Sequence, residues 1–262
     1  MDGSRIELIR VVGRGRAGRS LAAVLSASSR VGAVELLAGR DDVDRLRDRD
    51  RLRDAGAGAE FVVLAVPDHA IASVSDAIAE SPAIVVHLSG ALGLDVLDRH
   101  SRAAALHPLV SLPNPEIGAR RLRGAWCALG GEAEVTQLAD ALDARWFWIS
   151  DTERARYHAT AAWASNVVVG VLGEVERLAA SMGLPLAAFV ELSKGSVDNV
   201  ASVGPSLALT GPVAREDWDT IRGHLDALDD DQRPLYLAGV RSVARLAGVV
   251  VPTDIVAGGE SA

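Results

Sequence analysis

The sequence predicts an α/β protein in which a mainly parallel sheet, covered by helices on both faces, precedes a smaller all-helical domain. Short apolar runs alternate with segments of helical periodicity as far as Ile149, the order expected of parallel strands joined by helices. The runs are apolar at nearly every position, which is typical of strands buried on both faces. Beyond Asp151 the strand pattern stops. We therefore predict a sheet domain at residues 1–150 and a helical domain at residues 151–262.

Length and composition narrow the class of protein. The 262 residues suffice for one or two domains, and 49% apolar with 24% charged residues indicates a folded globular chain. A net charge of −8 disfavours nucleic acid and anionic membranes as partners, because both select a basic face. With Cys127 as its one cysteine, the chain can form neither an internal disulfide nor a multi-cysteine metal site.

The sequence shows no targeting or membrane-spanning pattern. The residues before Ile6 lack the basic-then-apolar layout of a signal peptide. The uncharged stretch Ala159–Gly173 is shorter than the roughly 20 apolar residues that a spanning helix needs. We therefore expect a cytoplasmic protein.

The predicted strands are apolar runs that stop at turn-forming residues. The first run stops at Gly13 and the third at Pro67. The full set is Ile6–Val12, Val34–Ala38, Glu60–Val66, Ala83–Leu88, Ala103–Leu106, Ala125–Leu129 and Arg145–Ile149.

The predicted helices carry apolar residues three or four positions apart. The longest pattern, in the second domain, ends at the helix stop signals Gly183 and Pro185. The predicted helices are Arg16–Ser28, Asp41–Asp54, Ile71–Ala79 and Ala133–Leu142 in the first domain, and Glu153–Met182, Leu186–Val200, Asp217–Leu228 and Pro234–Ala247 in the second.

The most specific motif is the turn Gly13-Arg14-Gly15-Arg16-Ala17-Gly18, which matches the pattern G-x-G-x-x-G. It follows a predicted strand and opens a predicted helix, the context that separates a dinucleotide site from a chance match. In that context Gly13 permits a tight turn, Gly15 lets the backbone approach a pyrophosphate, and Gly18 allows the helix to pack closely on the strand. The free N–H groups of the helix would bind the pyrophosphate.

The end of the second predicted strand should select the cofactor. A dinucleotide site that takes NAD places an acidic residue there for the ribose hydroxyls, whereas arginine suits the 2′-phosphate of NADP. The sequence offers both, since Arg40 is followed by Asp41 and Asp42. We favour NADP over NAD on the position of Arg40, with Arg14 assisting, and leave open that Asp41 or Asp42 binds the ribose.

Polar residues follow three predicted strands, at the edge of the sheet where ligands bind in such folds. Val66, Pro67 and Asp68 follow the third strand and are assigned to the cofactor. Ser89 and Gly90 follow the fourth and could approach a nicotinamide or a small substrate. His87 lies inside the fourth strand and is interpreted first as a hydrogen-bonded core residue.

His107 ends a strand before Pro108, and for it a core role and a substrate-binding role are equally compatible with the sequence.

One face of the long predicted helix combines small and polar residues. Residues three or four apart share a face of an α-helix. They are His158, Ala162, Ser165, Asn166, Val169 and Gly173. Two interpretations remain open: tight helix packing, or a polar wall facing the nicotinamide on which His158 and Asn166 bind a carbonyl or imine.

With these residues placed, the chain resembles a bacterial family of Rossmann-like proteins that carry a helical C-terminal domain of unknown function. Related proteins in the 6-phosphogluconate-dehydrogenase-like superfamily are ketopantoate reductase, pyrroline-5-carboxylate reductase and the deazaflavin-dependent NADP oxidoreductases. The resemblance spans nearly the whole chain. Its motifs are the Gly13 turn, Ala65–Asp68, His87–Ala91, Leu106–Leu109, His158–Asn166 and Leu209–Asp217 followed by His224-Leu225.

The resemblance implies an NADPH-dependent oxidoreductase that transfers hydride to a small carbonyl or imine between its domains. For the segment Leu209–Asp217 the resemblance implies a loop near the substrate, in which Thr210, Gly211 and Arg215 are candidate substrate-binding residues. A helix start capped by local contacts explains that segment equally well. By the same analogy we expect a homodimer through the helical domain.

One departure from these relatives bears on the chemistry. Hydroxyacid-type relatives such as ketopantoate reductase carry a lysine, the general acid, four residues before the asparagine of the long helix; here that position is Ala162. The sole lysine, Lys194, lies on a later helix. His158, one turn earlier, is the substitute acid, with Asn166 and Ser89 completing the predicted catalytic set. The alternative is a dinucleotide-binding regulator or scaffold without turnover.

Overall fold

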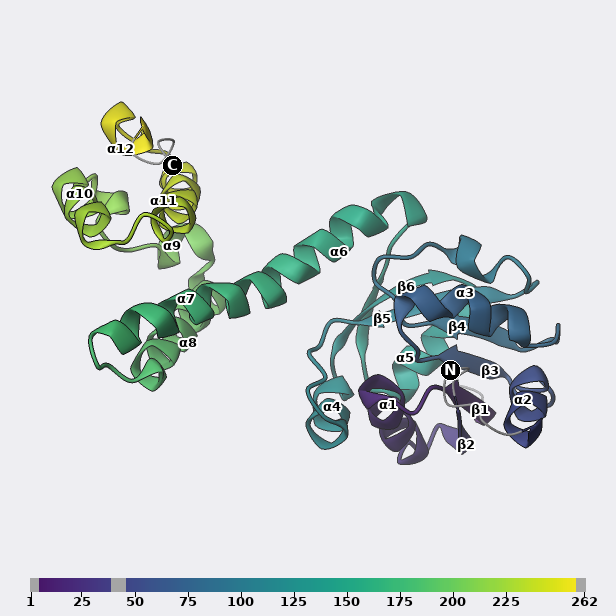
Figure 1. The fold of residues 1–262 in the computed structure, drawn as a ribbon. Coiled ribbons are helices and arrows are strands. Elements are labelled where there is room, and N and C mark those ends of the chain that lie inside the picture. Colours follow the sequence, from purple (N-terminus) through teal and green to yellow (C-terminus); the bar gives the residue numbers. More distant parts are fainter. Residues whose placement is uncertain (1–4, 39–45, 258–262) are drawn as a thin grey trace. The chain divides into compact units, whose positions relative to one another are not determined.

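The computed structural model describes residues 5–38 and 46–257 and divides into two compact units, Met1–Asn166 and Val167–Ala262. Figure 1 shows both units and labels their α-helices and the strands β1–β6. The first unit contains the sheet and the second, in its described part, is helical. The fold class predicted from the sequence is confirmed.

The first unit is built on a seven-stranded sheet in the order β2-β1-β3-β4-β5-β6-β7. Every neighbouring pair is parallel except β5 and β6, which are antiparallel. The strands agree with the predicted runs, although β2 begins at Val31 rather than Val34. They are β1 (Ile6–Val12), β2 (Val31–Leu37), β3 (Phe61–Leu64), β4 (Ile84–His87), β5 (Ala103–Pro108), β6 (Trp126–Gly131) and β7 (Arg145–Trp148).

The helices of the first unit connect these strands and cover the sheet. The sequence analysis missed α4, although Asn114 caps it by accepting a hydrogen bond from the Ile117 N–H at 2.8 Å and Pro115 opens it. The α-helices are α1 (Arg16–Ser26), α2 (Leu46–Arg53), α3 (Asp68–Ala77), α4 (Pro115–Leu122), α5 (Thr136–Ala141) and α6 (Arg154–Ala162), with 3₁₀ turns at η2 (Leu94–Leu97), η3 (Ala133–Val135) and η4 (Asp151–Glu153).

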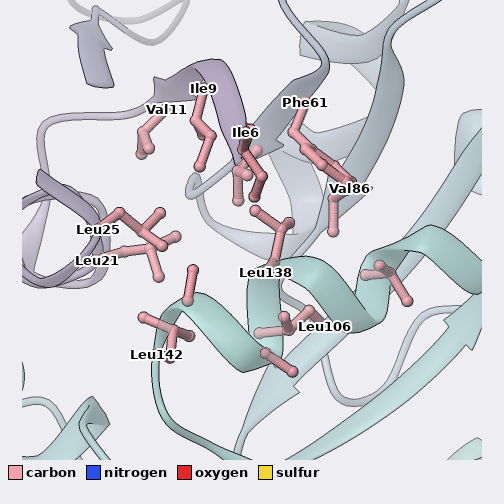
Figure 2. Close-up of a cluster of buried hydrophobic side chains, with 14 of the residues drawn as sticks. Ile6, Ile9, Val11, Leu21, Leu25, Phe61, Val86, Leu106, Leu138 and Leu142 are labelled. Atoms are coloured by element: carbon pink, nitrogen blue, oxygen red, sulfur yellow. The ribbon is translucent and has the colours of Figure 1, made fainter. Parts of the chain in front are cut away.

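Two apolar cores lie on the two faces of the sheet. On one face, side chains of α1 and α5 pack against β1, as Figure 2 shows for Leu21 and Leu25 opposite Val11 and for Leu138 next to Ile6. On the other face, α2, α3 and η2 cover the remaining strand positions. Burial on both faces explains why the central strand β3 is apolar throughout.

The second unit has a smaller core of its own, formed around α11 by Val213, Ile221, Leu237, Val240, Ala244 and Ile255. Its α-helices are α7 (Val168–Ser181), α8 (Leu186–Val203), α9 (Pro205–Ala208), α10 (Trp218–Ala227), α11 (Arg233–Ala247) and α12 (Thr253–Ala257), with a 3₁₀ turn at η6 (Val213–Arg215). Within the described ranges, no helix has the length and apolarity needed to cross a membrane.

The long helix predicted for Glu153–Met182 is not one regular α-helix. Between α6 and α7 the backbone forms a π-helical turn at Trp163–Val167. A π turn holds more residues than an α turn, so it rotates the residues beyond it around the helix axis. The predicted single face from His158 to Gly173 is therefore wrong, because it assumed uninterrupted α-helical spacing.

The first unit also extends further along the chain than the predicted boundary at residue 150. The start of α6 is fixed to the sheet by two side chains. Arg154 is buried at 1% exposure, and Tyr157 forms a hydrogen bond with His107 of β5. These contacts place α6 in the first unit, whose division from the second falls between Asn166 and Val167 in the π turn.

Candidate functional site

Two positions of the glycine-rich turn after β1, Gly13 and Gly18, accommodate only glycine. Gly13 adopts φ +117°, a conformation that L-residues rarely take, and its N–H donates to the Leu37 carbonyl at 3.0 Å. A Cβ on Gly13 would collide with the Ala65 carbonyl, and one on Gly18 would collide with the Gly13 carbonyl. The first and third glycines therefore hold β1, β3 and α1 in close contact.

Gly15 differs from its neighbours because the space over it is open. A Cβ on Gly15 would meet no atom of the described residues within 4 Å. Gly15 is the N-cap of α1, which has no side-chain capping bond and no acidic residue in its first turn. The first hydrogen bond of the helix runs from the Arg19 N–H to the Gly15 carbonyl. The amides of Arg16, Ala17 and Gly18 thus precede the first hydrogen bond of the helix, the arrangement that binds phosphate.

The turn lies at the point where the strand order reverses. From β1 the sheet continues to β2 on one side and to β3 on the other, and ligands of open α/β sheets bind outside such a switch point. Val66 and the exposed Pro67 and Asp68 follow β3 here, with Asp68 as the first residue of α3. This cradle fits the pyrophosphate of a dinucleotide.

Two arginines of the turn, Arg14 and Arg16, are exposed, and the Arg14 carbonyl accepts a 2.7 Å bond from the Arg19 guanidinium. Arg40, Asp41 and Asp42 lie outside the described residues, so the predicted choice of cofactor stays a prediction.

Ser89 is buried and holds its own turn together. Its hydroxyl donates to Asp68 at 2.7 Å and accepts from the N–H groups of Ala91 and Leu92, each at 3.1 Å. Its N–H donates to His87 Nδ1 at 3.2 Å. The hydroxyl predicted to be catalytic is therefore engaged in linking β4 to the start of α3.

A cluster of aromatic and imidazole rings lies at the end of β5. The Tyr157 hydroxyl and His107 Nδ1 are 2.6 Å apart, and the two rings meet edge to face. The His158 ring lies 6.1 Å from that of His107, and Gly90 packs so closely that a Cβ would be 2.8 Å from the imidazole. The structure thus brings together three predicted site residues, Gly90, His107 and His158.

Tyr157 is a member of this cluster that the sequence analysis missed. Its only sequence signal is its position beside His158, because its partner His107 is 50 residues earlier in the chain. The Phe147 ring supports the other side of Tyr157, with centroids 5.9 Å apart.

The site favours uncharged rings. Burial, with His158 and Arg154 nearby, lowers the pKa of His107 to about 4, although Asp68 opposes this shift. Burial also raises the pKa of Tyr157 to about 12. At neutral pH the imidazole carries no charge and the phenol keeps its proton.

A second buried polar group, His87, is the last residue of β4. His87 is fully buried, and within the described part of the chain neither its Nε2 nor the two Nη atoms of Arg154 have a hydrogen-bond partner. Arg154 Nε donates to Asp151 at 2.7 Å. Burial and the Arg154 charge lower the pKa of His87 to about 4. The interpretation of His87 as a core histidine agrees with this geometry.

The depressed pKa of His87 makes stability depend on pH. The His87 side chain binds a proton near pH 6.5 in the unfolded chain but only near pH 4 in the folded one. Its titration should therefore lower the free energy of unfolding by about 2–4 kcal/mol as the pH falls from 7 to 4. His87→Asn retains an acceptor for the Ser89 N–H but cannot titrate in this range. Urea unfolding at pH 7.5 and 4.5 should show a smaller acid loss in this variant than in the wild type; equal losses would contradict the assignment.

A pocket of about 140 Å³ connects the glycine-rich turn to the ring cluster. It is lined by Ala17, Leu21, Leu88, His107, Pro108, Val110, Leu112 and Leu122. Its wall therefore contains both a residue of the predicted phosphate-binding turn and the histidine bonded to Tyr157. A small organic group bound here would meet apolar side chains and one imidazole.

The remaining predicted site residues belong to the π turn and to the second unit. Asn166 is exposed in the π turn, and its Oδ1 accepts from Ser165 at 2.9 Å. Thr210, Gly211 and Arg215 belong to the second unit, where Arg215 ends η6 and is exposed. Their assignment to a substrate stays a prediction.

Comparisons with solved structures identify proteins of the same fold. A "putative NADP oxidoreductase" from Bacteroides fragilis is 18% identical, covering 92% of this chain and 98% of its own, with a TM-score of 0.73. A Thermotoga maritima protein is 23% identical with the same coverage and a TM-score of 0.69. Pyrroline carboxylate reductase from Plasmodium falciparum, solved with NADP bound, is 15% identical over 98% of this chain and 100% of its own, with a TM-score of 0.61. At these identities the likeness establishes the fold.

Two family models match the sequence, whereas no curated protein does. The first, a Rossmann-like domain, matches residues 3–113, and the second, a domain of unknown function (DUF2520), matches residues 130–243. The predicted order, a Rossmann-like domain followed by a C-terminal domain of unknown function, is confirmed. The chain joins an N-terminal Rossmann-like domain to a DUF2520 domain.

Proposed function

We propose that this protein is an oxidoreductase that uses a nicotinamide dinucleotide, NADPH in preference to NADH, to reduce a small carbonyl or imine. The observation that carries the proposal is the open space over Gly15 at the uncapped start of α1. Of two structures with this fold, one is described as a "putative NADP oxidoreductase" and the other, a reductase, was solved with NADP bound.

The residues of the chain divide between cofactor and substrate. The N–H groups of Arg16, Ala17 and Gly18 would bind the pyrophosphate, with the exposed Arg14 adding positive charge. Val66, Pro67 and Asp68 would border the same cofactor, and Arg40 would select the 2′-phosphate. When bound, the cofactor supplies the hydride.

The substrate side of the proposal rests on the ring cluster. Gly90 and His107 border the space for the reacting group, and the exposed His158 is a second group able to give a proton. Ser89 acts by holding Asp68 and the turn after β4 in place. Asn166, Thr210, Gly211 and Arg215 remain candidates for binding the rest of the substrate.

Incubation with NADPH and a panel of small aldehydes, ketones, 2-oxo acids and cyclic imines tests this function, with NADPH oxidation followed by its absorbance. We expect oxidation that depends on protein and substrate, and transfer of deuterium from only one face of the deuterated nicotinamide. Tight NADPH binding without oxidation across the panel would instead support the non-catalytic regulator or scaffold.

We further propose that the protein is a homodimer formed through its helical unit. Helix α8 is rich in apolar residues, yet none of them is buried, and Leu192 and Val197 are 69% and 64% exposed. A helix apolar on several faces is stable when another surface covers it. Sedimentation velocity should show a dimer, and Leu192→Glu should shift it towards the monomer, with Leu246→Glu on α11 as a control. A wild-type monomer at micromolar concentration would contradict the proposal.

A further inference from the structure

We propose that Tyr157 fixes His107 as a neutral imidazole whose Nε2–H donates to an oxygen of the substrate, so that the site takes a carbonyl rather than a protonated imine. The inference rests on the proposed reductase function and names its substrate class. It assigns His107 as a catalytic residue and Tyr157 as the residue that positions it.

The geometry restrains the imidazole on several sides. The Tyr157 hydroxyl lies 2.6 Å from Nδ1, and the phenol meets the imidazole at 88°. The Gly90 backbone packs against the ring so closely that no Cβ fits there. Phe147 in turn supports the phenol. A flip of the ring about Cβ–Cγ would put Cδ2 in place of Nδ1 and lose the bond to Tyr157.

The hydrogen-bond inventory selects one tautomer. If His107 Nδ1 carried the proton, the half-buried Tyr157 hydroxyl would have to accept that bond, and its own proton would need another acceptor. Among the described residues the Tyr157 hydroxyl has no other partner. With Tyr157 as the donor both groups are satisfied, which leaves the imidazole proton on Nε2. No described residue bonds Nε2, and His107 lines the pocket.

An N–H donor matches a carbonyl and opposes a protonated imine. A carbonyl oxygen accepts hydrogen bonds and becomes negative as its carbon is reduced, so a fixed donor stabilises the transition state. A protonated imine presents its own N–H, which would face the N–H of His107 with no acceptor between them. A neutral imidazole is an established type of donor to a reacting carbonyl.

The proton balance follows from the same pair. As the carbonyl carbon accepts hydride from the reduced nicotinamide, the oxygen takes the Nε2 proton and becomes a hydroxyl. Nδ1 takes the Tyr157 proton at the same time, so the imidazole stays neutral. Nδ1 then returns its proton to the phenolate while water protonates Nε2, which restores the Nε2–H tautomer. His158 and Asp68 are the titratable groups beside the imidazole, and Arg154 also lowers its pKa.

The tautomer can be measured without knowing the substrate. In protein labelled with ¹⁵N-histidine, long-range proton–nitrogen correlations at pH 7.5 should show His107 as the single Nε2–H tautomer, assigned by its loss in His107→Asn. Tyr157→Phe should convert His107 into a mixture. Tyr236→Phe is the matched control, because Tyr236 makes the same 2.6 Å bond to His224 Nδ1 in the second unit. An Nδ1–H tautomer, or no change in Tyr157→Phe, would overturn the proposal.

The substrate class is tested with named probes. Glyoxylate and pyruvate serve as carbonyls, and 1-pyrroline-2-carboxylate serves as the imine, each with NADPH. We expect reduction of a carbonyl probe over the imine, and a roughly tenfold to hundredfold lower kcat in Tyr157→Phe with unchanged NADPH binding. Preferred reduction of the imine would overturn the substrate class. Reduction of no probe would count against the reductase function itself, whereas the tautomer experiment would still decide the role of Tyr157.

Discussion

Gly15→Val should abolish dinucleotide binding while leaving the fold intact. The side chain would occupy the space over Gly15, where a Cβ meets no atom of residues 5–38 and 46–257 within 4 Å. The backbone of Gly15, at φ −70° and ψ −175°, is one that valine adopts without strain. We expect NADPH binding at least about a hundredfold weaker, because the pyrophosphate can no longer approach the backbone.

Isothermal titration calorimetry and thermal unfolding of the same samples check this prediction. The melting temperature without cofactor should match that of the wild type. Gly223→Val in α10 of the second unit, where a Cβ also meets no atom of the described residues within 4 Å, adds the same side chain outside the glycine-rich turn and should keep full affinity. Undiminished NADPH binding by Gly15→Val would show that the ligand does not use the glycine-rich turn.

Gly13→Ala should destabilise the protein more than Gly15→Val does. Its φ of +117° is unfavourable for alanine, and the new Cβ would collide with the Ala65 carbonyl, which is backbone and cannot move aside. Strain and overlap together should reduce the free energy of unfolding by about 2–4 kcal/mol.

Gly58→Ala separates the two causes. Gly58 also has a positive φ, +70°, but a Cβ there meets nothing within 4 Å. Gly58→Ala should lower the free energy of unfolding by about 1 kcal/mol, because it adds backbone strain without a collision. Urea unfolding of both variants measures the difference. Equal decreases in the free energy of unfolding for Gly13→Ala and Gly58→Ala would mean that the contact between the turn and β3 is looser than the structure shows.

The sequence was sufficient to predict elements defined by local patterns. Buried strands such as Phe61–Leu64 are continuous apolar runs, and the Gly13–Gly18 turn has a spacing that follows from its geometry. The predicted strands and most helices match the described structure for this reason. Helix α4 was missed even though Asn114 and Pro115 mark its start, because Ile117 and Leu122 are the only large apolar residues of this short helix.

The chemistry of the ring cluster could not be predicted in the same way. The bond between His107 and Tyr157 joins residues 50 positions apart, so it depends on where the sheet places α6. Arg154 would be expected on the surface from its charge, yet it is buried beside β4 and β6. Ser89 was identified as a polar residue in the right place, but only its three hydrogen bonds show that its hydroxyl is engaged.

Titration of the protein with NADPH and with NADH, followed by nicotinamide fluorescence, tests the central claim that the Gly13–Gly18 turn binds a reduced dinucleotide. We expect saturable binding of NADPH at one site per chain, weaker binding of NADH, and loss of both in Gly15→Val. Tighter binding of NADH would reverse the cofactor preference assigned to Arg40. Failure of the wild-type protein to bind either dinucleotide would contradict the account.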